Sequence, residues 1–541
     1  MLGKPIVYKA LFPLIALVMA IAWAPMAALS WLAPGWAELA EATELVGIIA
    51  RGAAHEPGCK QANPYFLPGD TEFLWEPGPR WTLGFAKQNM TGGPATRANI
   101  KNGLYNMAGY GHMVSTDTMD DLFAKAIYLD DNTGRGGMLY AVVDCIGLSD
   151  TDANAIRALA WEWARAAGIK SIQVAATHVH SGIDTIGLWK DLPYDGKDEA
   201  FQRLMIEKTA LALRGAYDAR RNGRLFVADV DSGGLFEDTR PPDVFDKTIT
   251  RFRFAPAETG GKDVYLLCAN CHPEMVGPNN SVISADFPAC AAAYIREATG
   301  AESMFIQGAI GALITSRDLQ TLLDEHSKNN TAYGMAQAKE FGVEFARRAL
   351  GEIGGVPVET ELPPLLNIAS AEIEVPIENL SFILALKLGI ISHGVYAVHC
   401  KPWKYAFTAE LSYLRLGGAA DSVDILVQPG ELAPEIAFGG FLPKENAALG
   451  TEYPRKPIFG YLNEYGFASE RQIVFGMANN FMGYVVPEND FVVDGLVPYI
   501  NVGTDRFGVA HYEETVSAGP RTAGALTEGF RVVFAKIDSP T

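Results

Sequence analysis

Apolar runs alternate with longer amphipathic stretches through the first half of the chain. The runs are rich in β-branched residues and predict strands at residues 138–145, 171–177 and 225–231. The stretches between them carry apolar residues every three or four positions and predict helices at 151–167 and 198–219. This alternation favours an α/β fold with a mixed, mostly parallel sheet flanked by helices, in which functional groups gather at strand ends.

Residues 10–32 show a different pattern, an apolar run without a charged residue. The run is long enough to cross a bilayer, which takes about 20 apolar residues. Lys4 and Lys9 on its amino side favour a cytoplasmic amino terminus. The sequence therefore predicts a signal anchor or transmembrane segment at 1–35, with a cleaved signal peptide as the alternative. Either interpretation exports the rest of the chain, which would face the periplasm or exterior, anchored or secreted.

Residues 36–80 indicate a short amphipathic helix and a linker, and residues 81–541 are predicted to form one catalytic domain. The chain is 49% hydrophobic and 20% charged, which is enough apolar material for a sizeable core. A net charge of −19 disfavours nucleic acid as a partner and broad attachment to anionic lipid. Access to a lipid would then need an apolar surface. Residues 380–391 are the candidate, with a core helix as the alternative there.

Thr177-His178-Val179-His180 follows the predicted strand at 171–177 directly. Residues two apart in an extended strand point to the same face, so both imidazoles are expected on one side of the strand end. Such a pair suits a zinc site in which one histidine binds the ion and the other transfers protons. Two polar residues that merely cap a strand end are the alternative interpretation.

Three further segments fit the same chemistry. His272 follows an apolar strand at 264–267 and precedes a helix that is predicted to begin at Pro288. Glu431 lies just beyond the apolar strand 423–427, in the run Gln428-Pro429-Gly430-Glu431, and Tyr484 ends the apolar run 476–485. Imidazole, carboxylate and phenolate groups are all plausible zinc ligands.

With these segments in this order, the chain resembles the neutral, non-lysosomal ceramidase family. The family patterns T-H-T-H-S-G-P, H-P/G-T-S-M-x-N-x-N-x-x-I-S-x-D, L-P-G-E and G-x-x-N-x-Y-x-x-Y-V/I are echoed at 177–183, 272–286, 428–431 and 476–485. Weaker matches occur at 84–94, 107–110 and 511–522, so that the resemblance runs from about Trp81 to Leu526.

The resemblance implies one zinc ion held by His178, His272, Glu431 and Tyr484. It also implies that His180 transfers protons and that Tyr512 stabilises the oxyanion that develops during the reaction. The implied reaction is hydrolysis of the amide bond of a ceramide-like N-acyl lipid, which releases a fatty acid and a sphingoid base.

The chain departs from the family pattern at substrate-binding positions. The family's N-R-S-P segment corresponds to 230–234, which lacks the arginine, and Arg240 is the candidate replacement. An isoleucine stands at the family's serine, with Thr315 and Ser316 as the nearest hydroxyls, and about 25 residues are inserted between Tyr484 and Tyr512. These departures leave a zinc hydrolase of a different amide or ester as an alternative function.

A rival pattern overlaps the third histidine. Cys268-Ala269-Asn270-Cys271-His272 is also the C-x-x-C-H pattern of haem c attachment. A disulfide between the two cysteines is a further alternative. A non-catalytic, membrane-anchored lipid- or haem-binding protein is therefore the hypothesis from another functional class.

Overall fold

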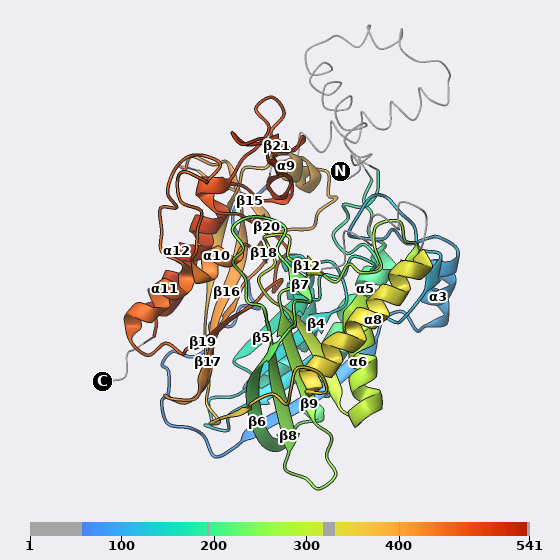
Figure 1. The fold of residues 1–541 in the computed structure, drawn as a ribbon, viewed down its shortest axis with the longest axis vertical. Coiled ribbons are helices and arrows are strands. Elements are labelled where there is room, and N and C mark those ends of the chain that lie inside the picture. Colours follow the sequence, from blue (N-terminus) through green and yellow to red (C-terminus); the bar gives the residue numbers. More distant parts are fainter. Residues whose placement is uncertain (1–56, 192–193, 317–330, 400, 538–541) are drawn as a thin grey trace.

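The protein forms two β-sheets packed face to face, with helices on both outer sides (Figure 1). The structure, a computed structural model, describes residues 57–191, 194–316, 331–399 and 401–537. The core between the sheets takes apolar side chains from both of them, among them Phe252, Ile306, Leu414 and Phe475. Burial of this shared apolar surface is what holds the two sheets together.

The larger sheet has nine strands. Their order is β11 (Glu302–Gln307), β9 (Val264–Ala269), β8 (Thr248–Pro256), β6 (Arg221–Asp231), β1 (Trp81–Asn89), β3 (Phe123–Asp130), β4 (Met138–Val143) and β5 (Ser171–Ala176), and β13 (Thr360–Leu362) also pairs with β6. Only the pairs β4–β5 and β9–β11 are parallel. Each parallel pair is joined by a helix, α4 (Asp150–Ala166) or α6 (Asp286–Thr299).

The predicted mixed sheet is confirmed, but the expectation that it is mostly parallel is wrong. Strand β6 follows α5 (Glu199–Asp218). It pairs antiparallel with β1 and β8 and does not lie beside β5. The short connection 131–137 between β3 and β4 also requires antiparallel pairing, because a parallel pair needs a longer crossover. The strand–helix rhythm predicted at 138–231 therefore specified one parallel crossover, β4–α4–β5, and not the whole sheet.

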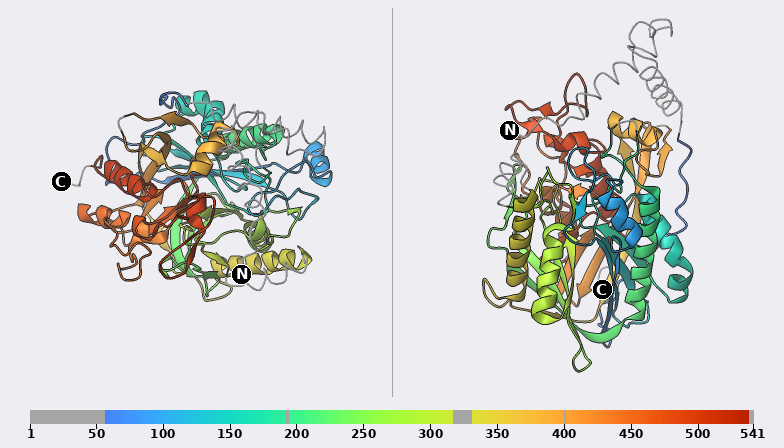
Figure 2. Two further views of the ribbon diagram at one scale, coloured as in Figure 1. Left: turned by 90° about the horizontal axis from the view of Figure 1, so that it is seen from above. Right: turned by 90° about the vertical axis from the view of Figure 1, so that its right-hand side faces the viewer.

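The smaller sheet is also mixed. Its order is β14 (Leu366–Ile377), β16 (Tyr405–Gly417), β17 (Ser422–Val427) and β19 (Arg471–Phe475), with β15 (Val395–Ala397) on β16, and only β17–β19 is parallel. Helices α10 (Pro434–Phe438), α11 (Ile458–Leu462) and α12 (Thr522–Phe534) pack on its outer face, while α4, α5, α6 and α8 (Thr331–Leu350) cover the larger sheet (Figures 1 and 2).

The remaining short elements connect the strands, and several of them lie at the strand ends that carry the predicted site. They are α3 (Pro94–Lys101), α9 (Leu380–Lys387), the 3-10 helices Asn463–Tyr465, Glu488–Asp490 and η4 (Glu513–Val516), and the two-residue strands β2 (Asp117–Thr118), β7 (Phe236–Glu237), β10 (Val282–Ile283), β12 (Thr315–Ser316), β18 (Glu431–Leu432), β20 (Tyr484–Val485), β21 (Gly503–Thr504) and β22 (Ala510–His511). Strand β18 pairs with β20, and β21 pairs with β22.

The helix predicted from Pro288 begins two residues earlier, at Asp286. The predicted anchor at 1–35 and the amphipathic helix of the 36–80 segment fall on residues 1–56, outside the described part of the chain. Among the described residues, no helix is long and apolar enough to span a bilayer. The apolar segment 380–391 is not a core helix, because most side chains of α9 are at least partly exposed.

Candidate metal centre

His178 and His180 point into one cluster, but not by strand alternation. Strand β5 ends at Ala176, and His178 already has a positive φ of 65°, a conformation that is uncommon outside glycine. The turn that follows brings the two imidazole rings to 5.0 Å between centroids. The prediction of a shared face is therefore right in its result and wrong in its mechanism.

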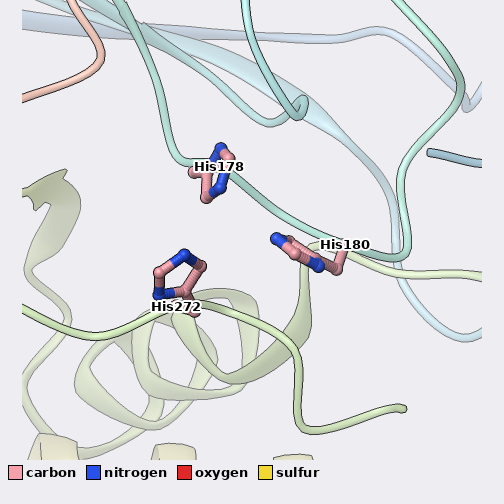
Figure 3. A group of neighbouring side chains, drawn as sticks. All are labelled: His178, His180 and His272. Carbon is pink, nitrogen blue, oxygen red and sulfur yellow. The ribbon is translucent and has the colours of Figure 1, made fainter. Parts of the chain in front are cut away.

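His272 completes the group, which we call the histidine cluster: His178, His180 and His272 (Figure 3). Strand β9 ends at Ala269 and delivers His272 to within 5.1 Å of the His178 ring and 5.6 Å of the His180 ring. One nitrogen from each ring lies within 4.8 Å of the others, and in the described residues no other group of three such ligands is this compact.

The opposite sheet supplies an acid to this cluster. Strand β18 follows β17, and its parallel pairing with β20 sets Glu431 opposite Tyr484. The Oε2 atom of Glu431 lies 3.2 Å from Nε2 of His272 and 3.4 Å from Nε2 of His178. All of these side chains are buried, so water does not screen them. Four side chains that the sequence predicted as ligands thus come from both sheets.

The hydrogen bonds of the two histidines fix how their rings are protonated. Nδ1 of His178 lies 2.7 Å from the Ile146 carbonyl oxygen, and Nδ1 of His272 lies 2.6 Å from the Ile314 carbonyl oxygen. A carbonyl oxygen only accepts, so each Nδ1 must carry the hydrogen. A neutral ring then presents a bare lone pair at Nε2, which is the usual state of a metal-bound histidine.

In neutral rings, two lone pairs would face a carboxylate oxygen, and a cation between them would offset the repulsion. Burial lowers the pKa of His272, but the hydrogen bond to Glu431 outweighs it and raises the pKa above its ordinary value, so a proton on Nε2 is the other arrangement. Zinc ligands at 2.0–2.1 Å in a tetrahedron are separated from one another by about 3.3 Å. The 3.2 and 3.4 Å between Glu431 and the two Nε2 atoms match that separation. Ring protonation would supply the positive charge otherwise. The chemistry of the donors and these two distances fit a zinc ion.

The electrostatics of the acidic ligands agree with this. Burial alone would raise the pKa of Glu431, but the charge of protonated His178 and His272 and the hydrogen bonds that they donate hold it below its ordinary value. A cation bound between the same groups would act in the same direction. Burial, followed by the charge of Glu431, raises the pKa of Tyr484 well above its ordinary value. Tyr484 would therefore bind as a phenolate only if a cation offset both effects.

His180 differs from its two neighbours because neither of its ring nitrogens has a hydrogen-bond partner. Burial, and then the nearby rings of His178 and His272, lower its pKa well below the ordinary value, so it is neutral near pH 7. Tyr110 packs edge-on against the ring at 5.2 Å between centroids. A neutral imidazole without a fixed partner is suited to accept and release a proton.

The sequence analysis missed Glu274, which lies beside this histidine. Its Oε2 atom is 3.7 Å from Nδ1 of His180 and accepts a 2.9 Å hydrogen bond from the Tyr110 hydroxyl. Its other oxygen accepts a hydrogen bond from Thr315. The family pattern carries threonine at this position, so the mismatch at Glu274 was the available signal.

The candidate replacements for the missing family residues already have partners within the protein. The Thr315 hydroxyl donates to Glu274 and that of Ser316 contacts the Met275 sulfur. Arg240 forms an ion-pair group with three acids, which we call the arginine cluster: Arg240, Asp490, Glu513 and Glu514. This cluster lies next in sequence to Tyr512, which is 41% exposed and whose ring is 6.3 Å from that of Tyr484.

The two cysteines of the haem-like pattern are free thiols that face different parts of the core. Cys268 lies in the core between the two sheets, and Cys271 lies in the core beneath α6 and α8. A haem group attached through both thiols would have to occupy both cores at once. The geometry is thus incompatible with haem c attachment, and the alternative disulfide between them is not formed.

No protein-family model and no curated protein sequence matches the chain. Solved structures do match. The crystal structure of neutral ceramidase from Pseudomonas aeruginosa superposes with a TM-score of 0.59 at 14% identity, over 84% of this chain and 74% of that one. A ceramidase complexed with C2 gives a TM-score of 0.56 at 14% identity, over 85% and 76%. The resemblance inferred from the sequence is confirmed at the level of the fold.

Proposed function

We propose that this protein is a zinc-dependent amide hydrolase that acts on a ceramide-like N-acyl lipid. One observation carries the proposal: two histidine lone pairs and a carboxylate oxygen converge at the spacing of zinc ligands, in a buried site at strand ends. The fold shared with neutral ceramidases supports the substrate class.

His178, His272 and Glu431 would hold the ion, with Tyr484 as the fourth ligand. A zinc ion there would act as a Lewis acid on a carbonyl oxygen and make water more acidic. The two ligand histidines are oriented by backbone carbonyls, as metal-bound histidines usually are. His180 lacks such a partner, and we therefore assign it to proton transfer rather than to the metal.

The chain's own residues then account for the bond changes. His180 takes a proton from water as the water oxygen adds to the amide carbon, and it returns that proton to the nitrogen as the carbon–nitrogen bond breaks. The Tyr512 hydroxyl donates a hydrogen bond to the carbonyl oxygen while negative charge develops there. Glu274 and Tyr110 confine the His180 ring between them.

A different amide or ester substrate is the second candidate. Glu274 favours it, because a buried carboxylate stands beside His180 where the family pattern has a hydroxyl, and the family arginine is missing. An acidic group at that place would select substrates with a hydrogen-bond donor or a cationic group near the scissile bond. The location predicted from residues 1–35, exported and membrane-anchored, stays a prediction.

The test uses the full chain purified in detergent and dialysed against zinc. We expect about one zinc per chain, hydrolysis of a fluorogenic ceramide, and no Soret band in the visible spectrum. The exposed His399 provides the control: His399→Ala should keep metal and activity. A protein that binds no zinc, or that binds zinc but cleaves neither amides nor esters, would exclude the proposal.

A further inference from the structure

The segment inserted between Tyr484 and Tyr512 has a buried base and an exposed apolar edge. At its base, Phe491 packs against Tyr484 and the ring of Tyr499 lies 6.4 Å from that of Phe491. At its edge, Leu496 is 92% exposed, and Phe507 and Val509 are more than half exposed. Apolar side chains on an insertion that already packs on the site are not needed for its own folding.

Helix α9 lies at the same end of the molecule as this edge (Figure 1). Asn379, which caps α9, donates hydrogen bonds to the backbone oxygens of Thr515 and Ser517, in the segment that follows Tyr512. The next residue, Leu380, is 60% exposed. Figures 1 and 2 both show α9 and β21 at the same end of the molecule. We call Leu380, Leu496, Phe507 and Val509 the apolar rim.

The described chain begins at this same end. The Gly58 carbonyl oxygen accepts a 2.9 Å hydrogen bond from the backbone of Ala397 in β15, and the Lys60 amine lies 5.8 Å from the Tyr396 ring. Figure 1 shows β15 near α9 and β21. The described chain therefore enters the fold at the end that carries the rim.

We propose that the apolar rim docks on the surface of a lipid bilayer, so that an N-acyl lipid passes from the membrane to the histidine cluster without crossing water. The inference rests on the proposed function. Tyr512, which is half exposed, follows the edge directly and faces Tyr484 across 6.3 Å. The net charge of −19 makes a zwitterionic surface the fitting partner, since contact is apolar rather than electrostatic.

The direct test is a depth measurement on the full chain bound to phosphatidylcholine vesicles. An environment-sensitive fluorophore is attached at Phe507→Cys, in a background with Cys59→Ser and Cys400→Ser. We expect a blue shift and quenching by lipids that carry a quencher in the acyl region. The same label at Leu159→Cys, equally exposed on the outer face of α4, should show neither. An unquenched label at 507 on vesicle-bound protein would overturn the proposal.

A kinetic measurement separates the rim from the active site. The triple variant Leu496→Asp, Phe507→Asp, Val509→Asp should lose at least about tenfold in rate on substrate embedded in vesicles, because each aspartate opposes insertion into the bilayer. It should keep its rate on a soluble short-chain substrate. Leu159→Asp with Val532→Asp, also exposed apolar positions, should change neither rate. If the triple variant and wild type hydrolysed vesicle-embedded substrate at equal rates, docking of the apolar rim on the bilayer would be rejected. If wild type cleaves neither substrate, the proposed function fails, and the quenching result still decides the docking surface.

Discussion

The histidine cluster and the arginine cluster are both largely buried groups of ionisable side chains, and they differ in the source of positive charge. Arg240 lies within 3.1 Å of a carboxylate oxygen from each of Asp490, Glu513 and Glu514, so this cluster contains its own cation. In the histidine cluster, two ring nitrogens lie beside Glu431, and neither belongs to a permanently charged side chain. Buried carboxylates need compensation of one kind or the other.

The difference separates a structural group from a functional one. An arginine is always charged and satisfies its acids with hydrogen bonds from a fixed, planar group. Such a cluster is complete and offers nothing to a substrate. On the proposed function, a bound positive ion completes the histidine cluster. Four tests, given from the largest expected effect to the smallest, probe this contrast.

His272→Ala should remove the metal and the activity together. With one Nε2 lone pair lost, the ligand set drops from four side chains to three, and we expect a loss of activity of more than about 10³-fold. Elemental analysis and turnover on the same sample provide the measurement. A variant that is active without zinc would show that the cluster is not a metal site.

His180→Ala should keep the metal and lose turnover. The ring holds no backbone carbonyl and is not assigned as a ligand, whereas proton transfer typically contributes about 10²- to 10⁴-fold to rate. Zinc content close to that of wild type, with kcat reduced by that factor, is the expected result. Loss of zinc in this variant would instead make His180 a third histidine ligand.

Arg240→Met should destabilise the fold rather than the chemistry. It leaves three buried acids without their cation, which costs about 3–5 kcal/mol in the free energy of unfolding. Denaturant unfolding of the two proteins measures the difference. Arg224→Met is the matched control, because Arg224 pairs with Glu361 on the surface and should leave the unfolding midpoint almost unchanged. If Arg240→Met and wild type were equally stable, the arginine cluster would not have the structural role assigned to it.

Glu435→Gln should alter how stability depends on pH. Glu435 lies near the arginine cluster, and burial, only partly offset by a backbone hydrogen bond and by Arg240, raises its pKa to about 8. The unfolded chain ionises this acid above about pH 4.5 while the folded protein keeps it protonated, so wild type loses stability as pH rises from 4.5 to 8.

The Glu435→Gln variant does not lose this stability, because its amide does not ionise. It should match wild type near pH 4 and exceed it by roughly 2–4 kcal/mol above pH 8. Chemical unfolding at several pH values measures the difference. Glu470→Gln, at an exposed position, should leave the profile unchanged. Parallel pH profiles for Glu435→Gln and wild type would show that Glu435 ionises normally.

Local elements were predictable because their signal is local. The helix predicted at 198–219 is found at Glu199–Asp218, and the strand predicted at 171–177 is found at Ser171–Ala176. Strand pairing was not predictable in the same way. Strand β1 joins β3 and β6 through contacts between residues far apart in sequence, and the rhythm of apolar positions does not encode them.

The site shows the same division. Its four predicted ligands follow strands and match family patterns, and the structure brings His178, His272 and Glu431 together. Glu274 was missed because motif comparison treats a mismatch as noise. The ion pairs of Arg240 were missed because its partners come some 250 residues later in the chain. The sequence therefore identified the residue types that can bind a metal or transfer protons, but it did not identify the residues that contact them.

The proposed metal centre lies across the boundary between the two large sheets. His178 and His272 follow strands β5 and β9 of one, and Glu431 and Tyr484 lie on the short β18–β20 pair that follows strands β17 and β19 of the other. An ion bound there would crosslink two halves of the molecule that are otherwise held together by apolar contact. Binding only to the closed sandwich, it would add about 2.7 kcal/mol to folding stability when present at a hundred times its dissociation constant. Metal supply would thereby govern how long the protein survives, as well as how fast it works.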